Sequence, residues 1–138
     1  MRSEVMEKSL GLVGRCFTGI LGTVNEYGIP QMKAMIKTAA NELKEYWFCT
    51  NTSSKRVIQI QNNPNASLYF YDEKTFEGLL LVGMAEVTFD DEKRKEFWSD
   101  GMEIYYPTGC TDPDYALIKF TAVKANYYHG LRNLDFEI

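Results

Sequence analysis

The chain has 138 residues, of which 45% are apolar and 25% are charged, and its formal net charge is −4. This composition excludes intrinsic disorder as the default state, because such a chain can bury enough apolar surface to offset the entropy of ordering. The acidic balance argues against nucleic-acid binding, and the absence of a long apolar run argues against a membrane span. The charged start and three widely spaced cysteines favour one cytoplasmic domain over residues 1–138.

The first half of the chain is predicted to hold two helices with three strands between them. Ser3 is expected to cap a helix that extends to about Gly14. Ser53 or Ser54 is expected to cap a second, shorter helix that ends near Pro64. Between these helices the sequence predicts a three-strand meander with turns at 26–28 and 40–42, and its strands are residues 16–25, 29–38 and 43–50.

The second half is predicted to hold mostly strands around one further helix. Strands are expected at residues 66–71, 79–89, 115–123 and 125–128. Gly83 marks a kink or a close approach within the long strand, and residues 90–106 form a helix whose first turn is acidic. Six or seven strands with two or three helices, mostly joined by short turns, predict a mainly β fold of the α+β class, a small antiparallel barrel.

The sharpest local signal is the segment TNTSSKR at residues 50–56, where a strand ends and a helix begins. Lys55 and Arg56 lie in the first helical turn, which is already the positive end of the helix dipole, so an anion there would resolve the conflict. Hydroxyl donors accompany them: Thr50, Thr52, Ser53 and Ser54. The pattern therefore indicates a phosphate site, although a capped surface helix with two solvated cations explains it equally well.

A second signal lies on the strand at residues 29–38. Lys33, Met35 and Lys37 alternate along it and so share one face. Two cations beside a methionine could hold a charged, planar ligand. The alternative is a solvent-facing strand whose lysines protect a sheet edge.

Aromatic residues make up 14% of the chain, which suits either a β-rich core or a site for a flat ring. Trp98, Tyr105 and Tyr106 could form an aromatic pocket wall, or they could pack their helix onto the barrel. His129 is the only histidine, so no metal site is expected, and no motif marks a catalytic nucleophile.

Four segments, in this order, resemble the pyridoxamine 5′-phosphate oxidase-like superfamily of FMN-binding split barrels, and in particular its general stress protein branch. They span most of the chain: LGTVNEYGIPQMKAMIK, YWFCTNTSSKRVIQIQNNPNASLYF, LLLVGMAEVTFDDEKRKEFW and YYPTGCTDPDYALIKFTAVKANYY. The resemblance implies a split β-barrel that binds FMN at the two-fold interface of a homodimer, where the partner subunit supplies the other wall.

Carried over by position, the resemblance implies that the FMN phosphate lies on the helix start at residues 53–56, with Lys37 nearby. The ring system would lie along residues 33–35, bordered by the strand end at 49–50. The implied cofactor-binding residues are Lys33, Ala34, Met35, Lys37, Cys49, Thr50, Ser53, Ser54, Lys55 and Arg56.

The chain also departs from the full oxidases of this superfamily. Met32 stands where they tend to begin the cofactor strand with Arg, and the C-terminal segment lacks their Trp. Asp112 and Asp114 are expected at the pocket mouth, where they would repel a dianionic substrate. We therefore expect a flavin-dependent oxidoreductase in a stress response, with an unknown small-molecule substrate and little pyridoxamine 5′-phosphate oxidase activity. The alternatives are a non-catalytic FMN-binding or sensing protein, or the same fold holding heme or a deazaflavin.

Overall fold

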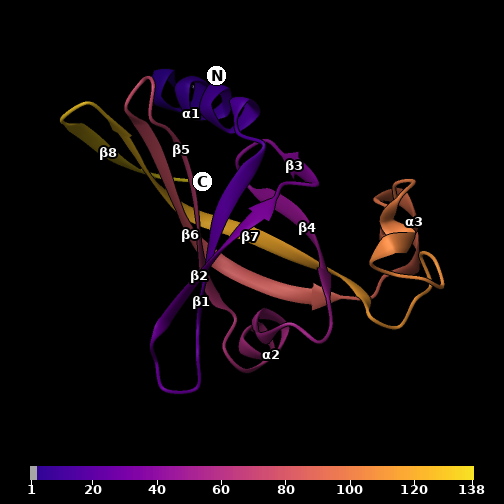
Figure 1. Cartoon of the computed structure of the whole chain (residues 1–138). Coiled ribbons are helices and arrows are strands. Elements are labelled where there is room, and N and C mark those ends of the chain that lie inside the picture. Colours follow the sequence, from indigo (N-terminus) through magenta and orange to yellow (C-terminus); the bar gives the residue numbers. More distant parts are fainter. Residues whose placement is uncertain (1–2) are drawn as a thin grey trace.

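The computed structural model describes residues 3–138 and is built on one antiparallel sheet of eight strands, which curves into an open barrel (Figure 1). The helical segments are α1 (Glu4–Arg15), α2 (Lys55–Asn62), α3 (Asp91–Glu96) and the 3-10 turn η1 (Met102–Ile104). The strands are β1 (Thr18–Val24), β2 (Pro30–Ile36), β3 (Ala39–Asn41), β4 (Glu45–Asn51), β5 (Asn65–Asp72), β6 (Glu77–Thr88), β7 (Tyr115–His129) and β8 (Arg132–Glu137). The predicted α+β split barrel is confirmed, with eight strands rather than six or seven.

The order of strands in the sheet is β2-β1-β5-β6-β7-β4-β3, and β8 pairs with the far half of β7. The predicted meander is therefore only half right: β1 pairs with β2, whereas β4 pairs with β7 and with β3. Tyr46, Phe48 and Thr50 alternate as buried residues on β4, and the stretch of β7 that pairs with this strand is mostly buried. The sheet consequently stays split between β2 and β4, which contact each other without pairing as strands.

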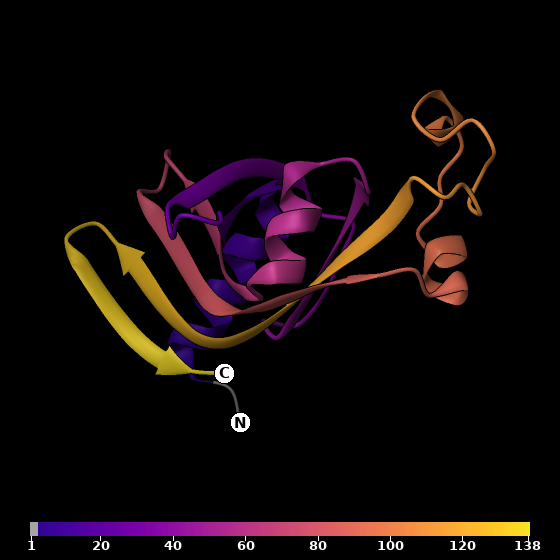
Figure 2. The ribbon, with the colours of Figure 1, turned by 90° about the horizontal axis from the view of Figure 1, so that it is seen from below.

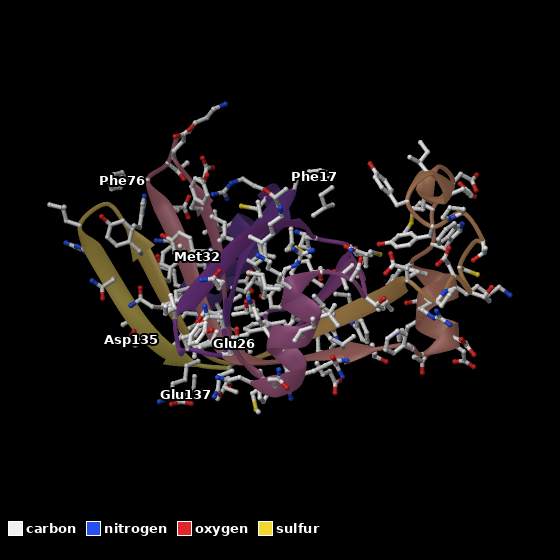
Figure 3. The ribbon with its side chains drawn as sticks, turned by 60° about the horizontal axis from the view of Figure 1, so that its bottom comes forward. Phe17, Glu26, Met32, Phe76, Asp135 and Glu137 are labelled. Carbon is white, nitrogen blue, oxygen red and sulfur yellow. The ribbon has the colours of Figure 1, made fainter. Side chains whose placement is uncertain are left out.

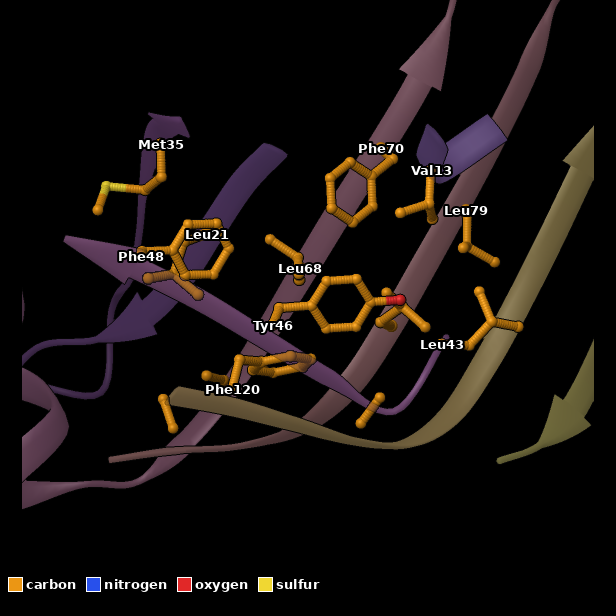
Figure 4. Close-up of a cluster of buried hydrophobic side chains, with 14 of the residues drawn as sticks. Val13, Leu21, Met35, Leu43, Tyr46, Phe48, Leu68, Phe70, Leu79 and Phe120 are labelled. Carbon is orange, nitrogen blue, oxygen red and sulfur yellow. The ribbon is translucent and has the colours of Figure 1, made fainter. Parts of the chain in front are cut away.

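A single large core fills the barrel and is closed at one end by α1. Tyr46, Phe48, Phe70 and Phe120 are fully buried in it and lie around Leu68 (Figure 4). Fully burying side chains of this kind stabilises the fold by roughly 1.5–3 kcal/mol each. Ser3 caps α1 as predicted, since its side chain accepts a hydrogen bond from the N–H of Met6.

The long β6–β7 pair bends at Gly83, as predicted. A Cβ atom at Gly83 would lie 1.9 Å from the carbonyl oxygen of Thr121, so only glycine fits there. The pairing register shifts at Val82 and Gly83, because Val123 is an extra residue on β7. The long β6–β7 pair extends past the barrel in both directions. The β7–β8 hairpin lies at one of its ends and the α3 region at the other (Figure 2).

Three predictions about the connections are wrong. The third helix ends at Glu96 rather than at Tyr106, with Phe97 as its C-cap, and Gly101, whose φ is 98°, begins the separate turn η1. The expected turn at 40–42 is instead mostly the short strand β3, and the chain turns after it at Glu42. The last two strands merge into β7, and β8 follows a turn at Gly130. No helix within residues 3–138 is long and apolar enough to span a membrane.

Candidate functional site

The predicted cofactor residues lie on both sides of the split in the barrel. Residues 33–36 belong to β2, the strand at one end of the sheet, and Lys37 follows it directly, whereas residues 49–51 end β4 and lead toward α2. The split thus brings the two-lysine strand and the hydroxyl-rich loop to one region of the molecule (Figure 1). In the chain, β3 and the turn after it connect β2 to β4.

The start of α2 is arranged around Ser54. Its hydroxyl oxygen caps the helix by accepting from the N–H of Val57 at 3.4 Å, and it also lies 3.4 Å from Thr50 Oγ1. Arg56 Nη2 donates to the same Thr50 oxygen at 3.3 Å. Two hydroxyls and one guanidinium therefore meet at the positive end of a helix, which is the donor set that binds phosphate.

Arg56 is a partly buried cation that lacks a carboxylate partner among residues 3–138. Its Nε atom is buried and makes no hydrogen bond. Burial lowers the pKa of the Arg56 guanidinium, and the group that opposes this effect is Tyr106 rather than a carboxylate. Since buried cations are normally paired, the site is short of one negative charge.

The loop before α2 is held by Asp114, at the start of β7. Its Oδ1 accepts from the hydroxyl of Thr52 at 2.7 Å and from the N–H of Ser53 at 3.2 Å. Asp112, which is buried, accepts from the N–H groups of Asp114 and Thr108. Both carboxylates thus shape the loops beside the site, and their repulsion of a dianionic substrate stays a prediction.

An aromatic cluster adjoins Cys49 and Thr50. Tyr106 is buried and its ring centroid lies 4.9 Å from that of Tyr115, while Trp98 lies 5.4 Å from Tyr115 on another side. Burial, together with the neighbouring Cys49 thiol and Asp114, raises the pKa of Tyr106 to about 12, so its hydroxyl stays protonated at neutral pH. The Cys49 sulfur lies 3.8 Å from the Tyr115 hydroxyl oxygen.

Of the three aromatic residues predicted to form a wall, two pack together and one does not. Trp98 and Tyr106 belong to the cluster, which also includes Phe97 and Trp47. Tyr105 is 74% exposed and points away from this packing, although its ring edge approaches Tyr106. Sequence reasoning missed Tyr115 as a site neighbour, because only the β4–β7 pairing brings residue 115 beside residue 51.

The β2 residues occupy several environments. Met35 is buried in the core, Ala34 faces outward, and Lys33 is exposed. Lys37 Nζ donates to the carbonyl oxygen of Val13 at 2.6 Å, at the last turn of α1, and burial lowers its pKa. In this structure Lys37 thus satisfies a helix C-terminus, and its contact with a cofactor stays a prediction.

Lys55 and Arg56 diverge. Lys55 is exposed and lines a groove beside α2 together with Ile58 and Gln59, whereas Arg56 turns toward Thr50. Neighbouring side chains on a helix point about 100° apart. Lys55 therefore does not point directly at an anion that Thr50 and Arg56 would bind.

Comparison with known proteins defines the class. A family model described as pyridoxamine 5′-phosphate oxidase like matches residues 4–135. The chain belongs to this family, which confirms the resemblance drawn from the sequence. It is also 32% identical over 82 residues to a pyridoxine/pyridoxamine 5′-phosphate oxidase of Burkholderia mallei. The match covers 59% of this chain and only 38% of that oxidase.

Several solved structures are similar to this chain over most of its length. A Clostridium acetobutylicum protein related to general stress protein 26 of Bacillus subtilis is 40% identical, with a TM-score of 0.89 over 100% of this chain and 97% of that one. General stress protein 26 of Bacillus anthracis is 21% identical, with a TM-score of 0.81 over 99% and 100% of the two chains. A heme-binding protein of Mycobacterium smegmatis shares the fold at 16% identity, with a TM-score of 0.78 over 99% of this chain and 59% of that one.

Proposed function

We propose that the protein is a single-domain, cytoplasmic FMN-binding flavoprotein and acts as a flavin-dependent oxidoreductase on a small molecule. The observation that carries the proposal is the partly buried Arg56, whose Nε is unpaired and whose Nη2 shares Thr50 with Ser54. A phosphate group would supply the missing negative charge and accept from these donors. The FMN phosphate fits this role in a family named after an oxidase.

The chain's own residues would bind and orient the cofactor. Thr50, Ser54 and Arg56 would hold the phosphate, with Ser53 and Lys55 contributing a hydroxyl and charge from the helix start. The Cys49 side of β4 and the β2 residues Lys33 to Met35 would border the ring, while Tyr106 and Trp98 exclude water beside it. The bound flavin would supply the redox chemistry, and no side chain of this chain is assigned as an acid or base.

A homodimer would complete the flavin site. The outer face of the sheet carries exposed apolar side chains on separate strands, including Met32 on β2, shown in Figure 3, and Val82 and Met84 on β6. Such a face usually marks an interface, and a two-fold dimer is the commonest way to cover it. Sedimentation of the FMN-loaded protein should give twice the chain mass of 15.9 kDa. A monomer that retains FMN tightly would contradict the shared site.

The heme and deazaflavin alternatives are separated from FMN by one spectrum. The fold also occurs in a heme-binding protein, but His129 here lies at the exposed end of β7, next to the β7–β8 turn and away from the Arg56 region. The purified protein, reconstituted in turn with FMN, heme and a deazaflavin, should retain FMN and show the visible bands of an oxidised flavin. Retention of heme with an intense Soret band and no flavin would overturn the proposal.

Catalysis is tested separately from binding. The FMN-loaded protein should oxidise a reduced nicotinamide in the presence of an electron acceptor, faster than free FMN does. It should turn over pyridoxamine 5′-phosphate far more slowly than the ordinary enzymatic range of about 1 per second or faster. FMN binding without any turnover of the nicotinamide would favour the non-catalytic binding or sensing role.

A further inference from the structure

A groove of about 840 Å³ separates α2 from the β1–β2 hairpin, and Lys55 is the one lining residue that it shares with the proposed flavin site. One wall is a single face of α2, on which side chains recur three and four residues apart. The other wall is the hairpin. The lining residues are Val24, Asn25, Glu26, Gly28, Gln31, Lys55, Ile58, Gln59, Asn62 and Asn63. The volume suits a small molecule, and half of the lining residues carry side-chain amides.

The amides of this groove are oriented by bonds inside the protein. Asn25 Oδ1 accepts from the N–H groups of Tyr27 and Ile29, each at 2.9 Å. Asn63 Oδ1 accepts from the N–H of Asn65 at 3.2 Å. A backbone N–H can only donate, so in both residues the carbonyl oxygen faces the backbone and the NH2 group is left to donate elsewhere.

Gln59 follows the same rule. The buried hydroxyl of Thr23 donates to Gln59 Oε1 at 2.6 Å, which leaves the Gln59 NH2 group unengaged. Lys55 adds an ammonium group that has no carboxylate partner within the described residues 3–138. Two acceptors also line the groove, namely the exposed carboxylate of Glu26 at the hairpin beside α2 (Figure 3) and the carbonyl of Gln31, whose NH2 group bonds to Pro30.

We propose that this groove is a second binding site, distinct from the flavin phosphate site, for a small anion with several oxygen acceptors. Three amide NH2 groups whose carbonyls are already engaged, together with one ammonium group, form a donor-rich surface. Carboxylate and phosphate oxygens accept without donating and so match it, whereas the several hydroxyl donors of a neutral polyol would find side-chain acceptors only at Glu26 and Gln31. Val24 and Ile58 provide apolar contact for the carbon skeleton of such a ligand.

Isosteric substitutions test the donor argument. Asn25→Asp and Asn63→Asp keep the oxygen that accepts from the backbone, so the hairpin and the end of α2 should fold as before. Each replaces the free NH2 donor with a negatively charged oxygen. Titration with citrate by calorimetry should therefore show binding to the parent that weakens about tenfold or more in either variant. The matched control Asn41→Asp makes the same charge change on the exposed strand β3 and should bind citrate as the parent does.

Two further arms keep the result unambiguous. Ile58→Trp fills the groove from an exposed position while every amide residue is kept, and it should also abolish citrate binding. Sorbitol should not bind. The proposal is overturned if citrate does not bind the parent, if sorbitol binds as well as citrate, or if the Asp variants bind citrate unchanged.

The same titration on FMN-loaded protein separates this site from the proposed flavin site. Citrate should still bind after FMN loading and should weaken by no more than about tenfold, because Lys55 is the only residue that the two proposed sites share. Displacement of citrate by FMN with one-to-one stoichiometry would show that the groove belongs to the flavin site and would overturn the proposal of a second site. A protein that binds citrate but not FMN would instead refute the proposed function alone.

Discussion

Replacing Arg56 with Met separates a ligand-binding role from a structural one. In the free protein the substitution removes the Thr50 bond, which at 3.3 Å is long, and it also removes a desolvated cation without a carboxylate partner. These effects oppose each other, and partial exposure weakens both, so the free energy of unfolding should change by less than about 1 kcal/mol. If Arg56 had only a structural role, its replacement would lower the free energy of unfolding by more than this.

FMN binding should respond much more strongly to Arg56→Met. A hydrogen bond to a charged group is worth about 1.5–3 kcal/mol, which corresponds to a loss of roughly 10- to 150-fold in affinity. Denaturant unfolding of the free protein and fluorescence titration with FMN measure the two quantities. Arg132→Met, on exposed β8, is the control for charge and should change neither. A large loss of stability with unchanged FMN affinity would refute the reasoning.

The other predictions concern the frame of the site. Gly83→Ala should destabilise the fold by about 1–3 kcal/mol in denaturant unfolding, because the added Cβ collides with the Thr121 carbonyl; an unchanged midpoint would show that the bend relaxes. Asp114→Ala should weaken FMN binding several-fold by freeing the loop that holds Ser53, and unaltered affinity would detach that loop from the site. The N–H groups of Asp114 and Thr108 lower the pKa of Asp112, so its carboxylate stabilises the fold above its ordinary pKa of about 3.9 and loses this effect as pH falls through the lower folded value. Asp112→Asn should flatten that acid loss of stability, and an identical pH profile would contradict it.

Local features of the fold could be predicted from the sequence because they depend on neighbouring residues. Ser3 and Ser54 cap α1 and α2 as expected, since capping needs only a hydroxyl and the N–H three residues on. Residues 66–71 lie in a strand as predicted, and Leu68 and Phe70 are fully buried on it. The bend at Gly83 could be predicted, because a glycine inside a strand often marks the close approach of another backbone.

Features that depend on pairing over long distances could not be predicted. Nothing near β4 in the sequence shows that its partner is β7, nearly seventy residues later. The sequence alone therefore predicts that this strand pairs with its neighbour in the chain, as a meander. For the same reason the contact of Asp114 with the Thr52 hydroxyl was missed. The helix start at residues 53–56 was predicted, but the different directions of Lys55 and Arg56 depend on how α2 lies between the hairpin and Thr50.

The central claim is that FMN is held through its phosphate at Thr50, Ser54 and Arg56. Calorimetric titration of the free protein with FMN and with riboflavin, which has the same ring but no phosphate, tests it most directly. The account predicts that FMN binds at least about tenfold more tightly than riboflavin, since charge-assisted hydrogen bonds to the phosphate are worth about 1.5–3 kcal/mol each. Equal affinity for the two compounds would contradict it.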